Sequence, residues 1–306
     1  MMAISVNSAR RRFLAVSGVA LVTFAAALAL PALTLSARAA EGEAKRIVAI
    51  GGAVTEIVYA LGEEDRLVAR DQTSTYPPEA AELPDVGYIR ALSPEGVLSV
   101  NPDMIIALEG YGPPEAVSVL AQAGVPIVEI PDGYDGASIL TKIRATAKAL
   151  GREEAGEALA EKVGAELAEA EKIATGVTDK RKVLFVLSLQ GGRILAAGAN
   201  THADGIIRMA GGVNVIDGID GYKPVTDEAV IEAAPEVILM MDRGGDHDAA
   251  KTEVLDHPAI AMTPAGKNRA FVRMDGLYIL GFGPRTASAA RDLGNALHGE
   301  ASSQGN

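Results

Sequence analysis

Short apolar runs alternate along the chain with segments whose apolar residues recur at helical spacing. The helical segments begin or end at Gly, Pro or a side chain that can cap a helix. Alternation of this kind predicts parallel strands covered by helices. Thr55 is expected to cap the first helix, which should end at Gly62. The expected strands are 46–50, 67–69, 104–108 and 127–130, and the later helices are 93–100 and 114–123.

The same order of elements restarts at residues 182–187, and a further helix is expected at 204–209. In both copies a Ser or Thr caps a short helix with an acid in its first turn, a Pro ends the helix, and an apolar strand follows. The identical spacing predicts a duplicated lobe, although a capped helix could occur twice by chance. The matched segments, 133 residues apart, are 93–98 with 226–231 and 101–106 with 234–239.

Between the two copies, residues 136–174 have a helical pattern that is broken near Gly151. Leu159, Val163 and Leu167 give its second part a narrow apolar stripe. The whole pattern predicts an α/β protein of two Rossmann-like lobes with parallel sheets, joined by a long rigid linking helix, with the ligand cleft between the lobes. The expected boundaries are 46–150 for the N-terminal lobe, 151–175 for the linking helix and 182–298 for the C-terminal lobe.

The N-terminus has the pattern of an export signal. Three arginines at 10–12 precede an apolar run at 13–35, and Ala37-Arg38-Ala39 supplies the small residues of a cleavage site. We therefore expect residues 1–39 to be a signal peptide, with a retained membrane anchor as the alternative because the run is long enough to span a membrane. The arginines also resemble a twin-arginine signal, so export by either the general or the twin-arginine route stays open.

Composition narrows the classes of function. The 306 residues include 28 Lys and Arg against 40 Asp and Glu, a net charge of −12 that becomes −16 once residues 1–39 and their four arginines are removed. A nucleic-acid binder needs a basic face, which this charge disfavours. Because the chain has no Cys, disulfides, thiolate metal sites, thiol nucleophiles and a lipid-modified Cys are excluded. We expect a free periplasmic protein.

Motifs of catalysis are missing from the sequence. The segment 281–286, Gly-Phe-Gly-Pro-Arg-Thr, lacks the third Gly of a dinucleotide loop, and there is no Walker sequence, nucleophile elbow or HExxH. An exported enzyme is therefore the less favoured alternative to a binding protein. His257 and His298 fall in segments expected at the surface, and His202 and His247 in loops expected at the cleft, so a site of several imidazoles is not expected.

Tyr88 is the most informative side chain. It lies in the loop 84–90, just before the helix capped by Ser93, and Arg90 follows two residues later. A phenol in this position could bind Fe(III), because metal ligation removes its proton and the phenolate neutralises part of the charge. Alternatively, the ring could be an aromatic lid that packs on the edge of the cleft.

The segment 86–96, with its Gly-Tyr-x-Arg-x-Leu motif, resembles the periplasmic haemin-binding proteins of bacterial ABC importers, and the segments 71–77, 196–204 and 280–286 add to the resemblance. It extends over residues 46–298. These proteins belong to the class III substrate-binding proteins, which also take up cobalamin and ferric siderophores. The resemblance implies that haem b is carried as a transported ligand, with a siderophore or cobalamin receptor as the alternative.

The resemblance also implies roles for single residues. Tyr88 matches the axial tyrosinate of the haem iron, Arg90 matches a partner of the haem propionates, and Arg243 does so less closely. Some relatives supply a second iron ligand from the other lobe or hold two stacked haems, and His202 is the candidate for such a ligand. Arg70 is a further cation in the cleft loops. Expected walls of the haem slot, each of which could equally be ordinary packing, are Tyr76, Tyr111, Ile89 and Phe282.

One acid on each lobe is implied to dock the protein on its inner-membrane permease, which works with an ATPase. The matching positions are Glu95 and Glu228, which are also paired by the internal repeat. Each acid lies in the first turn of an expected helix, where it can also offset the helix dipole. We expect the protein to be a monomer that has no catalytic activity of its own.

Overall fold

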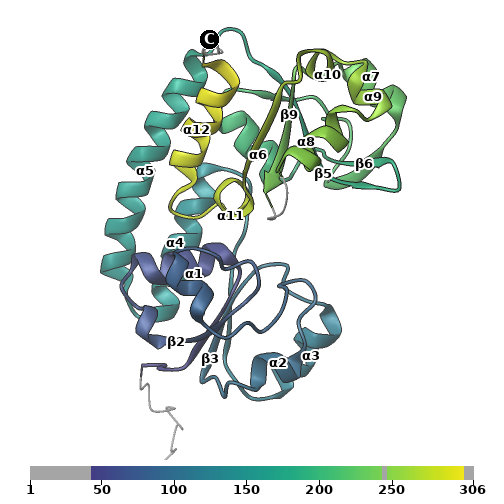
Figure 1. Ribbon diagram of the computed structural model, residues 1–306. Helices are drawn as coiled ribbons and strands as arrows, with labels where there is room; N and C mark the ends of the chain where they lie inside the picture. The colour runs from purple at the N-terminus through teal and green to yellow at the C-terminus, as the bar shows by residue number, and fades with distance from the viewer. Residues whose placement is uncertain (1–42, 243–246, 300–306) are drawn as a thin grey trace, which may run out of the picture. The chain divides into compact units, whose positions relative to one another are not determined.

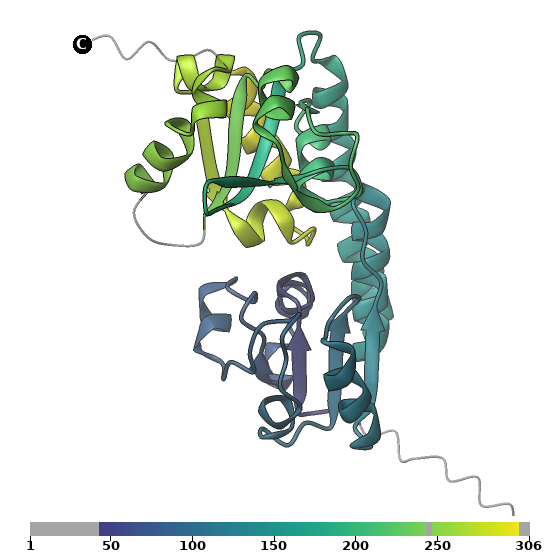
Figure 2. The same cartoon turned by 90° about the vertical axis from the view of Figure 1, so that its right-hand side faces the viewer.

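The first sheet of the computed structural model is parallel throughout, with strand order β2-β1-β3-β4 (Figure 1). Figure 2 shows the arrows of β1 (purple) and its blue neighbours pointing the same way. The expected strands are confirmed to within a residue, because each is a short apolar run; every residue of β1 is fully buried. The strands are β1 Ile47–Ile50, β2 Leu67–Arg70, β3 Met104–Leu108 and β4 Ile127–Ile130. The structure describes residues 43–242 and 247–299.

Three α-helices accompany this sheet among the described residues, at α1 Gly52–Ala60, α2 Pro94–Leu98 and α3 Pro114–Gln122, with short 3-10 turns at Glu64–Arg66 and Pro78–Glu82. The predicted cap of the first helix is wrong. The helix begins after Gly51, at φ 107°, a conformation that favours glycine. Thr55 lies inside α1, fully buried, with its hydroxyl 2.7 Å from that of Ser74.

The second sheet is mixed, with strand order β10-β9-β5-β6-β8 and β7 paired to β5. Strands β5, β9 and β10 are parallel, as expected for this lobe, whereas β6 and β8 run antiparallel. Strands β6, β8 and β10 were not predicted. Gly191 and Gly192, both at positive φ, join β5 to β6 in a tight hairpin. The strands are β5 Lys182–Gln190, β6 Arg193–Ala197, β7 Val213–Asn214, β8 Tyr222–Val225, β9 Val237–Asp242 and β10 Phe271–Asp275.

The helices of the second lobe lie between and after its strands, and α12 is the last of them. Thr201 caps α6 and Thr226 caps α7, each by accepting a hydrogen bond from a backbone N–H in the first turn. The helices are α6 His202–Met209, α7 Asp227–Ala233, α8 His247–Leu255, α9 Pro258–Ala261, α10 Pro264–Asn268, α11 Gly276–Leu280 and α12 Thr286–His298.

Two helices lie between the sheets in sequence, α4 Gly136–Leu150 and α5 Glu153–Gly176. The break expected near Gly151 is present, and this residue adopts the left-handed conformation that ends α4. Val163 and Leu167 of the expected stripe are buried, and α5 packs beside α4 and α12 (Figure 1). Within the described residues, no helix combines the length and the apolar character needed to cross a membrane.

The internal repeat has a counterpart in local geometry. The backbone N–H of Asp103 donates to the Arg46 carbonyl, and the Asp103 carboxylate accepts from the backbone N–H groups of Lys45 and Arg46 at 2.9 and 3.0 Å. Glu236, 133 residues on, makes the same reciprocal contact with Lys182, at 2.8 and 2.9 Å. In each lobe the acid after the turn therefore holds the start of the neighbouring central strand, as a duplication predicts.

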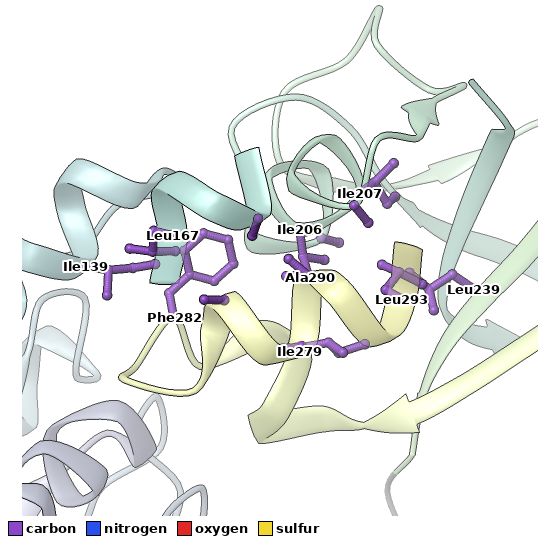
Figure 3. Close-up of a cluster of buried hydrophobic side chains, with 14 of the residues drawn as sticks. Ile139, Leu167, Ile206, Ile207, Leu239, Ile279, Phe282, Ala290 and Leu293 are labelled. Carbon is purple, nitrogen blue, oxygen red and sulfur yellow. The ribbon is translucent and has the colours of Figure 1, made fainter. Parts of the chain in front are cut away.

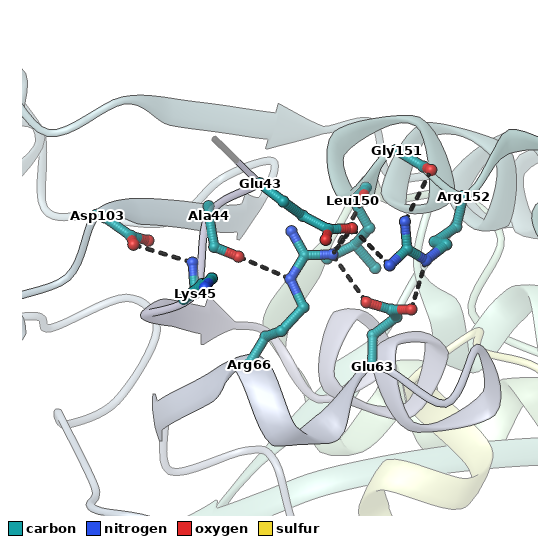
Figure 4. A network of polar contacts seen from close by, with 9 residues as sticks. All are labelled: Glu43, Ala44, Lys45, Glu63, Arg66, Asp103, Leu150, Gly151 and Arg152. Carbon is teal, nitrogen blue, oxygen red and sulfur yellow. Dashed lines mark hydrogen bonds and ion pairs between the residues drawn. The ribbon is translucent and has the colours of Figure 1, made fainter. Parts of the chain in front are cut away.

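A network of ion pairs fixes the beginning of the described chain (Figure 4). Arg66 donates to the Glu63 carboxylate at 2.8 Å and to the Leu150 carbonyl at 2.9 Å, and Arg152 pairs with both Glu63 and Glu43. Burial raises the pKa of Glu63, but the hydrogen bonds from Arg66 and Arg152 outweigh it and lower the pKa overall. The network joins the first residues of the folded protein to the end of α4.

Helices of both lobes contribute to one buried cluster (Figure 3). Ile57 of α1 and Ile139 of α4 belong to it together with Ile206 of α6 and Phe282, which precedes α12. All of the described residues belong to a single compact unit. The apolar core is therefore continuous from the helices beside the first sheet to those beside the second.

Candidate functional site

Tyr88 lies on a loop that is held from both sides. Its side chain is 43% exposed, whereas Val86 and Ile89 beside it are buried in the core of the first lobe. Gly87 is at φ 106°, and its carbonyl accepts a hydrogen bond from the Gln72 backbone at 2.8 Å. A large aromatic residue exposed on an anchored loop is available to a ligand, and the role of Tyr88 as an iron ligand stays a prediction.

Arg70 stabilises the loop that carries Tyr88 through polar contacts. Its guanidinium forms an ion pair with the Asp85 carboxylate at 3.0 Å and donates to the carbonyls of Asp71 and Ala81. The other oxygen of Asp85 accepts from the Gly87 backbone N–H at 2.8 Å. The cation expected to face a ligand therefore takes part in a structural ion pair, and it positions the turn that carries Tyr88.

Asp71 organises the neighbouring loop and was missed as an individual residue. It is fully buried, and its carboxylate accepts hydrogen bonds from the Gly51 backbone, from the Thr73 backbone and hydroxyl, and from the Ser74 hydroxyl, at 2.7 to 2.9 Å. An ionised carboxylate with this many donors is well satisfied without a cation. Its position directly after a predicted strand is the signal that could have identified it.

Tyr76 lies at the end of that loop and stacks on an arginine from the second lobe. The guanidinium of Arg285 is 3.4 Å from the centre of the Tyr76 ring, and Tyr76 is 39% exposed. A pocket of about 260 Å³ adjoins the stack, and residues from both lobes line it: Thr75, Tyr76, Asp275, Tyr278 and Arg285. Tyr76 therefore has one face against a cation and part of its surface open.

The other three expected walls of the haem slot lie in the apolar cores or pack against them. Phe282 is 1% exposed and belongs to the core in Figure 3, so its assignment to the slot is wrong. Ile89 is also buried, in the core of the first lobe, and Tyr111 is half-buried against that core. Burial raises the pKa of the Tyr111 phenol, which disfavours a phenolate there. Periodicity alone could not distinguish these packing residues from a ligand surface.

Arg90 is exposed, and its charge reaches a tyrosine of the second lobe. Burial raises the pKa of Tyr222 to about 12, and hydrogen bonds with Ala203 and Thr201, together with the charge of Arg90, act in the opposite direction. Tyr222 therefore remains a neutral phenol bonded to the start of α6.

His202 has partners that the sequence did not reveal. Its Nε2 is 3.1 Å from the Asp132 carboxylate, and its ring packs edge-on against Tyr134 and Phe282. Lys142, which is fully buried, pairs with the same carboxylate at 2.7 Å. Nε2 of this candidate iron ligand is therefore engaged in a half-buried polar cluster.

The remaining candidate residues, three histidines and Arg243, lie in different parts of the chain. His257, expected at the surface, is 7% exposed; its Nε2 donates to the Gly192 carbonyl at 2.8 Å and its Nδ1 accepts from the Ala259 backbone. His298 is half-buried. His247 begins α8, and Arg243 lies outside the described residues. Across residues 43–242 and 247–299, no three His, Asp or Glu side chains are grouped to hold a metal ion.

Glu95 and Glu228 are both exposed in the first turns of short helices, as expected. Ser93 caps α2 and also donates its hydroxyl to the Glu95 carboxylate at 2.8 Å. Backbone and Ser93 hydrogen bonds lower the pKa of Glu95, so it is ionised at neutral pH. The two acids have the equivalent position in the two lobes.

The fold and the site together define a two-lobed α/β binding protein with loops from both lobes around one pocket. A family model described as periplasmic binding protein matches residues 47–277, and the chain belongs to this family. Members are substrate-binding proteins of transport systems, and one relative, from Bacillus subtilis, carries the description of an ABC transporter substrate-binding lipoprotein at 27% identity over 65% of this chain and 64% of its own.

Solved structures add close relatives. The periplasmic haem-binding protein BhuT, in complex with two haems, is 40% identical with a TM-score of 0.78, covering 84% of this chain and 98% of its own. RhuT from Roseiflexus sp. RS-1, a haem-binding protein in its apo form, is 41% identical with a TM-score of 0.79, covering 83% and 97%. A vitamin B12-binding protein of Vibrio campbellii is 30% identical over 74% of this chain and 81% of its own.

Proposed function

We propose that this protein captures haem in the periplasm and delivers it to an inner-membrane ABC permease. The observation that carries the proposal is the exposed phenol of Tyr88 on an anchored loop, with Arg90 exposed two residues further on. Solved haem-binding relatives at 40 and 41% identity support the same ligand. Haem offers one ferric iron, two carboxylates and a flat apolar ring, and it is the transported cargo here.

Tyr88 is the proposed iron ligand, because its phenol would give up its proton on binding Fe(III), and the resulting phenolate is a favourable ligand for that ion. Arg90 is the proposed partner of a propionate, and Arg243 a second one. The exposed part of Tyr76 is the proposed contact for the macrocycle. Arg70 is assigned a supporting role, because it already pairs with Asp85. His202 is proposed as a second ligand only through its Nδ1, since its Nε2 contacts Asp132.

The pocket of about 260 Å³ is smaller than the roughly 300–1,000 Å³ of typical small-molecule sites. We infer that it receives one edge of the haem, while the rest of the ring lies against the Tyr88 loop. Because Tyr76 and Tyr88 are both exposed, the proposed ligand surface is open enough to accept a second, stacked haem.

Absorption titration of haemin into the purified mature chain tests the proposal. The wild-type protein should give a ferric phenolate spectrum, and Tyr88→Phe should lose it, because the substitution removes only the hydroxyl. Tyr59→Phe is the matched control, since Tyr59 packs against the core of the first lobe and has no role in the proposed site. If Tyr88→Phe binds haemin with the wild-type spectrum and affinity, the assignment of the ligand is wrong. The titration also gives the number of haems per chain.

Cobalamin is the second candidate ligand, because the curated relatives include vitamin B12-binding proteins. The same titration with cyanocobalamin decides between the two. Tight cobalamin binding together with weak haemin binding would favour the second candidate.

We further propose that Glu95 and Glu228 contact the permease, that residues 1–39 are removed on export, and that the mature protein is a monomer without catalytic activity. The lobes are proposed to comprise residues 46–150 and 182–298, with a rigid linking helix at 151–175. The exposure of both acids at equivalent positions supports the docking role. Their negative charge would steer the protein toward a basic permease surface.

A further inference from the structure

The loop 281–286, which resembles no dinucleotide motif, lies where the second lobe meets helices of the first. Phe282 adopts a left-handed conformation, at φ 51°, and its ring is buried in the cluster that includes Ile57 and Ile139 (Figure 3). A bulky residue at positive φ is rare and costs conformational energy, so the surrounding contacts must hold it in place. Side chains from α1 and α4 supply these contacts.

Glu56 of α1 provides the first contact. Its carboxylate accepts from the backbone N–H of Arg285 at 3.0 Å and from the Arg285 guanidinium at 2.9 Å. Glu56 is 5% exposed. Gly283 lies directly against this carboxylate, since a Cβ at this position would be 3.3 Å from the Glu56 Cδ. The stack of Arg285 on Tyr76 extends the contact to the proposed ligand surface.

Lys142 of α4 provides the second contact. Its Nζ lies 2.7 Å from the Asp132 carboxylate and 3.4 Å from the Gly281 carbonyl. The same Asp132 carboxylate contacts His202 of α6 at 3.1 Å. Glu56 and Lys142 therefore hold the same loop at two points, Arg285 and Gly281.

Charges buried in this way lose their hydration, and an apolar replacement of equal volume often gives equal or greater stability. Buried ion pairs can nevertheless select one arrangement of the packed elements, because any other arrangement leaves a charge unpaired. Here the pair Glu56–Arg285 and the contact of Asp132 with His202 each join residues of different lobes, so the selected arrangement is that of the lobes.

We propose that the loop 281–286, with Glu56, Asp132, Lys142 and His202, forms an inter-lobe clasp that fixes one arrangement of the two lobes, and that Glu56 and Lys142 are thereby positioning residues for the ligand. The second part rests on the proposed haem binding, whereas the first part does not. A ligand that contacts both lobes binds only molecules whose lobes are correctly arranged.

Spin labels test the clasp directly. Because the chain has no Cys, Glu115→Cys on α3 and Glu232→Cys on α7, both exposed, give one label on each lobe. Electron–electron distance measurements should show a single narrow distribution in the otherwise wild-type chain. Glu56→Gln should broaden it at least twofold, and the Kd for haemin should rise about tenfold if only about a tenth of the molecules remain competent to bind. Lys142→Met should have the same effect.

Glu157→Gln is the matched control. It breaks the Arg144–Glu157 ion pair, which is also bidentate, with both contacts at 2.7 Å, but is half-exposed and joins α4 to α5. The control should leave distances and affinity unchanged. Circular dichroism identifies which variants fold. If Glu56→Gln does not fold, Arg285→Gln replaces it; this variant should also broaden the distance distribution, because it removes the guanidinium that pairs with Glu56.

The outcomes separate the two claims. An unchanged distance distribution in the folded variants overturns the clasp. A broadened distribution with unchanged haemin affinity overturns the positioning role. If the wild-type chain binds no haemin, the proposed function fails, and the distances between the labels still decide whether the clasp exists.

Discussion

Asn101 and Ala234 adopt the same left-handed conformation, at φ 49° and 47°, in equivalent turns of the two lobes. Each is followed by a Pro and by an acid that holds the start of a central strand. For L-residues this conformation costs about 1–2 kcal/mol, and Asn tolerates it better than Ala does. The second lobe therefore retains the turn of the first with a residue that is less suited to it.

Ala234→Asn should stabilise the protein by about 0.5–1 kcal/mol, because it relieves this strain. The reciprocal change, Asn101→Ala, should destabilise it by a similar amount. Urea denaturation of the mature chain measures both. Destabilisation by Ala234→Asn would contradict the equivalence of the two turns.

Gly205→Ala should destabilise the protein by about 1–3 kcal/mol, although Ala usually favours a helix. A Cβ at this position in α6 would collide with the Tyr134 carbonyl and lie 2.8 Å from Cζ of Phe282. Gly164→Ala in α5 is the control, since its Cβ would meet only Leu140 at 3.4 Å, and it should be neutral or stabilising by up to about 1 kcal/mol. Thermal melts that rank the two variants equally would refute the close packing at Gly205.

Arg70→Ala should weaken haemin binding about three- to tenfold without altering the phenolate spectrum, because it loosens the Tyr88 loop and leaves the proposed ligand in place. Asp85→Ala should act similarly, and the double variant should be less than additive because the two residues form one ion pair at 3.0 Å. Absorption titrations give the affinities. Fully additive losses would indicate that Arg70 contacts the haem itself.

Acid should destabilise the protein through Asp132. Burial raises the pKa of this carboxyl, but the hydrogen bond from His202 and the charge of Lys142 outweigh it and hold the pKa well below its usual range. A lowered folded-state pKa gives stability that is present above the unfolded pKa of about 3.9 and is lost as the pH falls further, by about 2 kcal/mol in total.

Asp132→Asn should flatten this dependence on pH. Urea denaturation from pH 5 down to pH 2.5 provides the measurement, with Asp227→Asn, on the exposed first turn of α7, as the control. An equal slope for Asp132→Asn and the wild-type chain would show that Asp132 does not contribute.

Glu95→Gln combined with Glu228→Gln should slow haem transport into permease-containing vesicles at least fivefold and leave the Kd for haemin unchanged. Each substitution keeps the shape and removes one charge at the proposed contact. The control of equal charge is Glu115→Gln, on α3 beside α2, with Glu232→Gln, one turn further along α7; both acids are exposed. Equal transport rates for the two double variants would remove the docking role.

Local pattern and spacing determined much of this protein. The apolar runs predicted β1, β3 and β4 almost to the residue, and the matched spacing predicted two capped helices, followed in each lobe by a Pro and a strand. These features are local, since a buried strand needs only an apolar run and a cap needs only a side chain within three residues of the N–H that it accepts. Tyr88 was found in the same way, from a motif on one loop.

Tertiary structure alone decided which of the candidate residues hold the fold together. Arg70 pairs with Asp85, Phe282 lies in the core, and His202 meets Asp132, which is 70 residues away in sequence. Burial and long-range pairing depend on how separate elements pack, and no window of sequence contains that information. The antiparallel strands β6 and β8 were missed for the same reason, because their position depends on pairing with β5 and with each other.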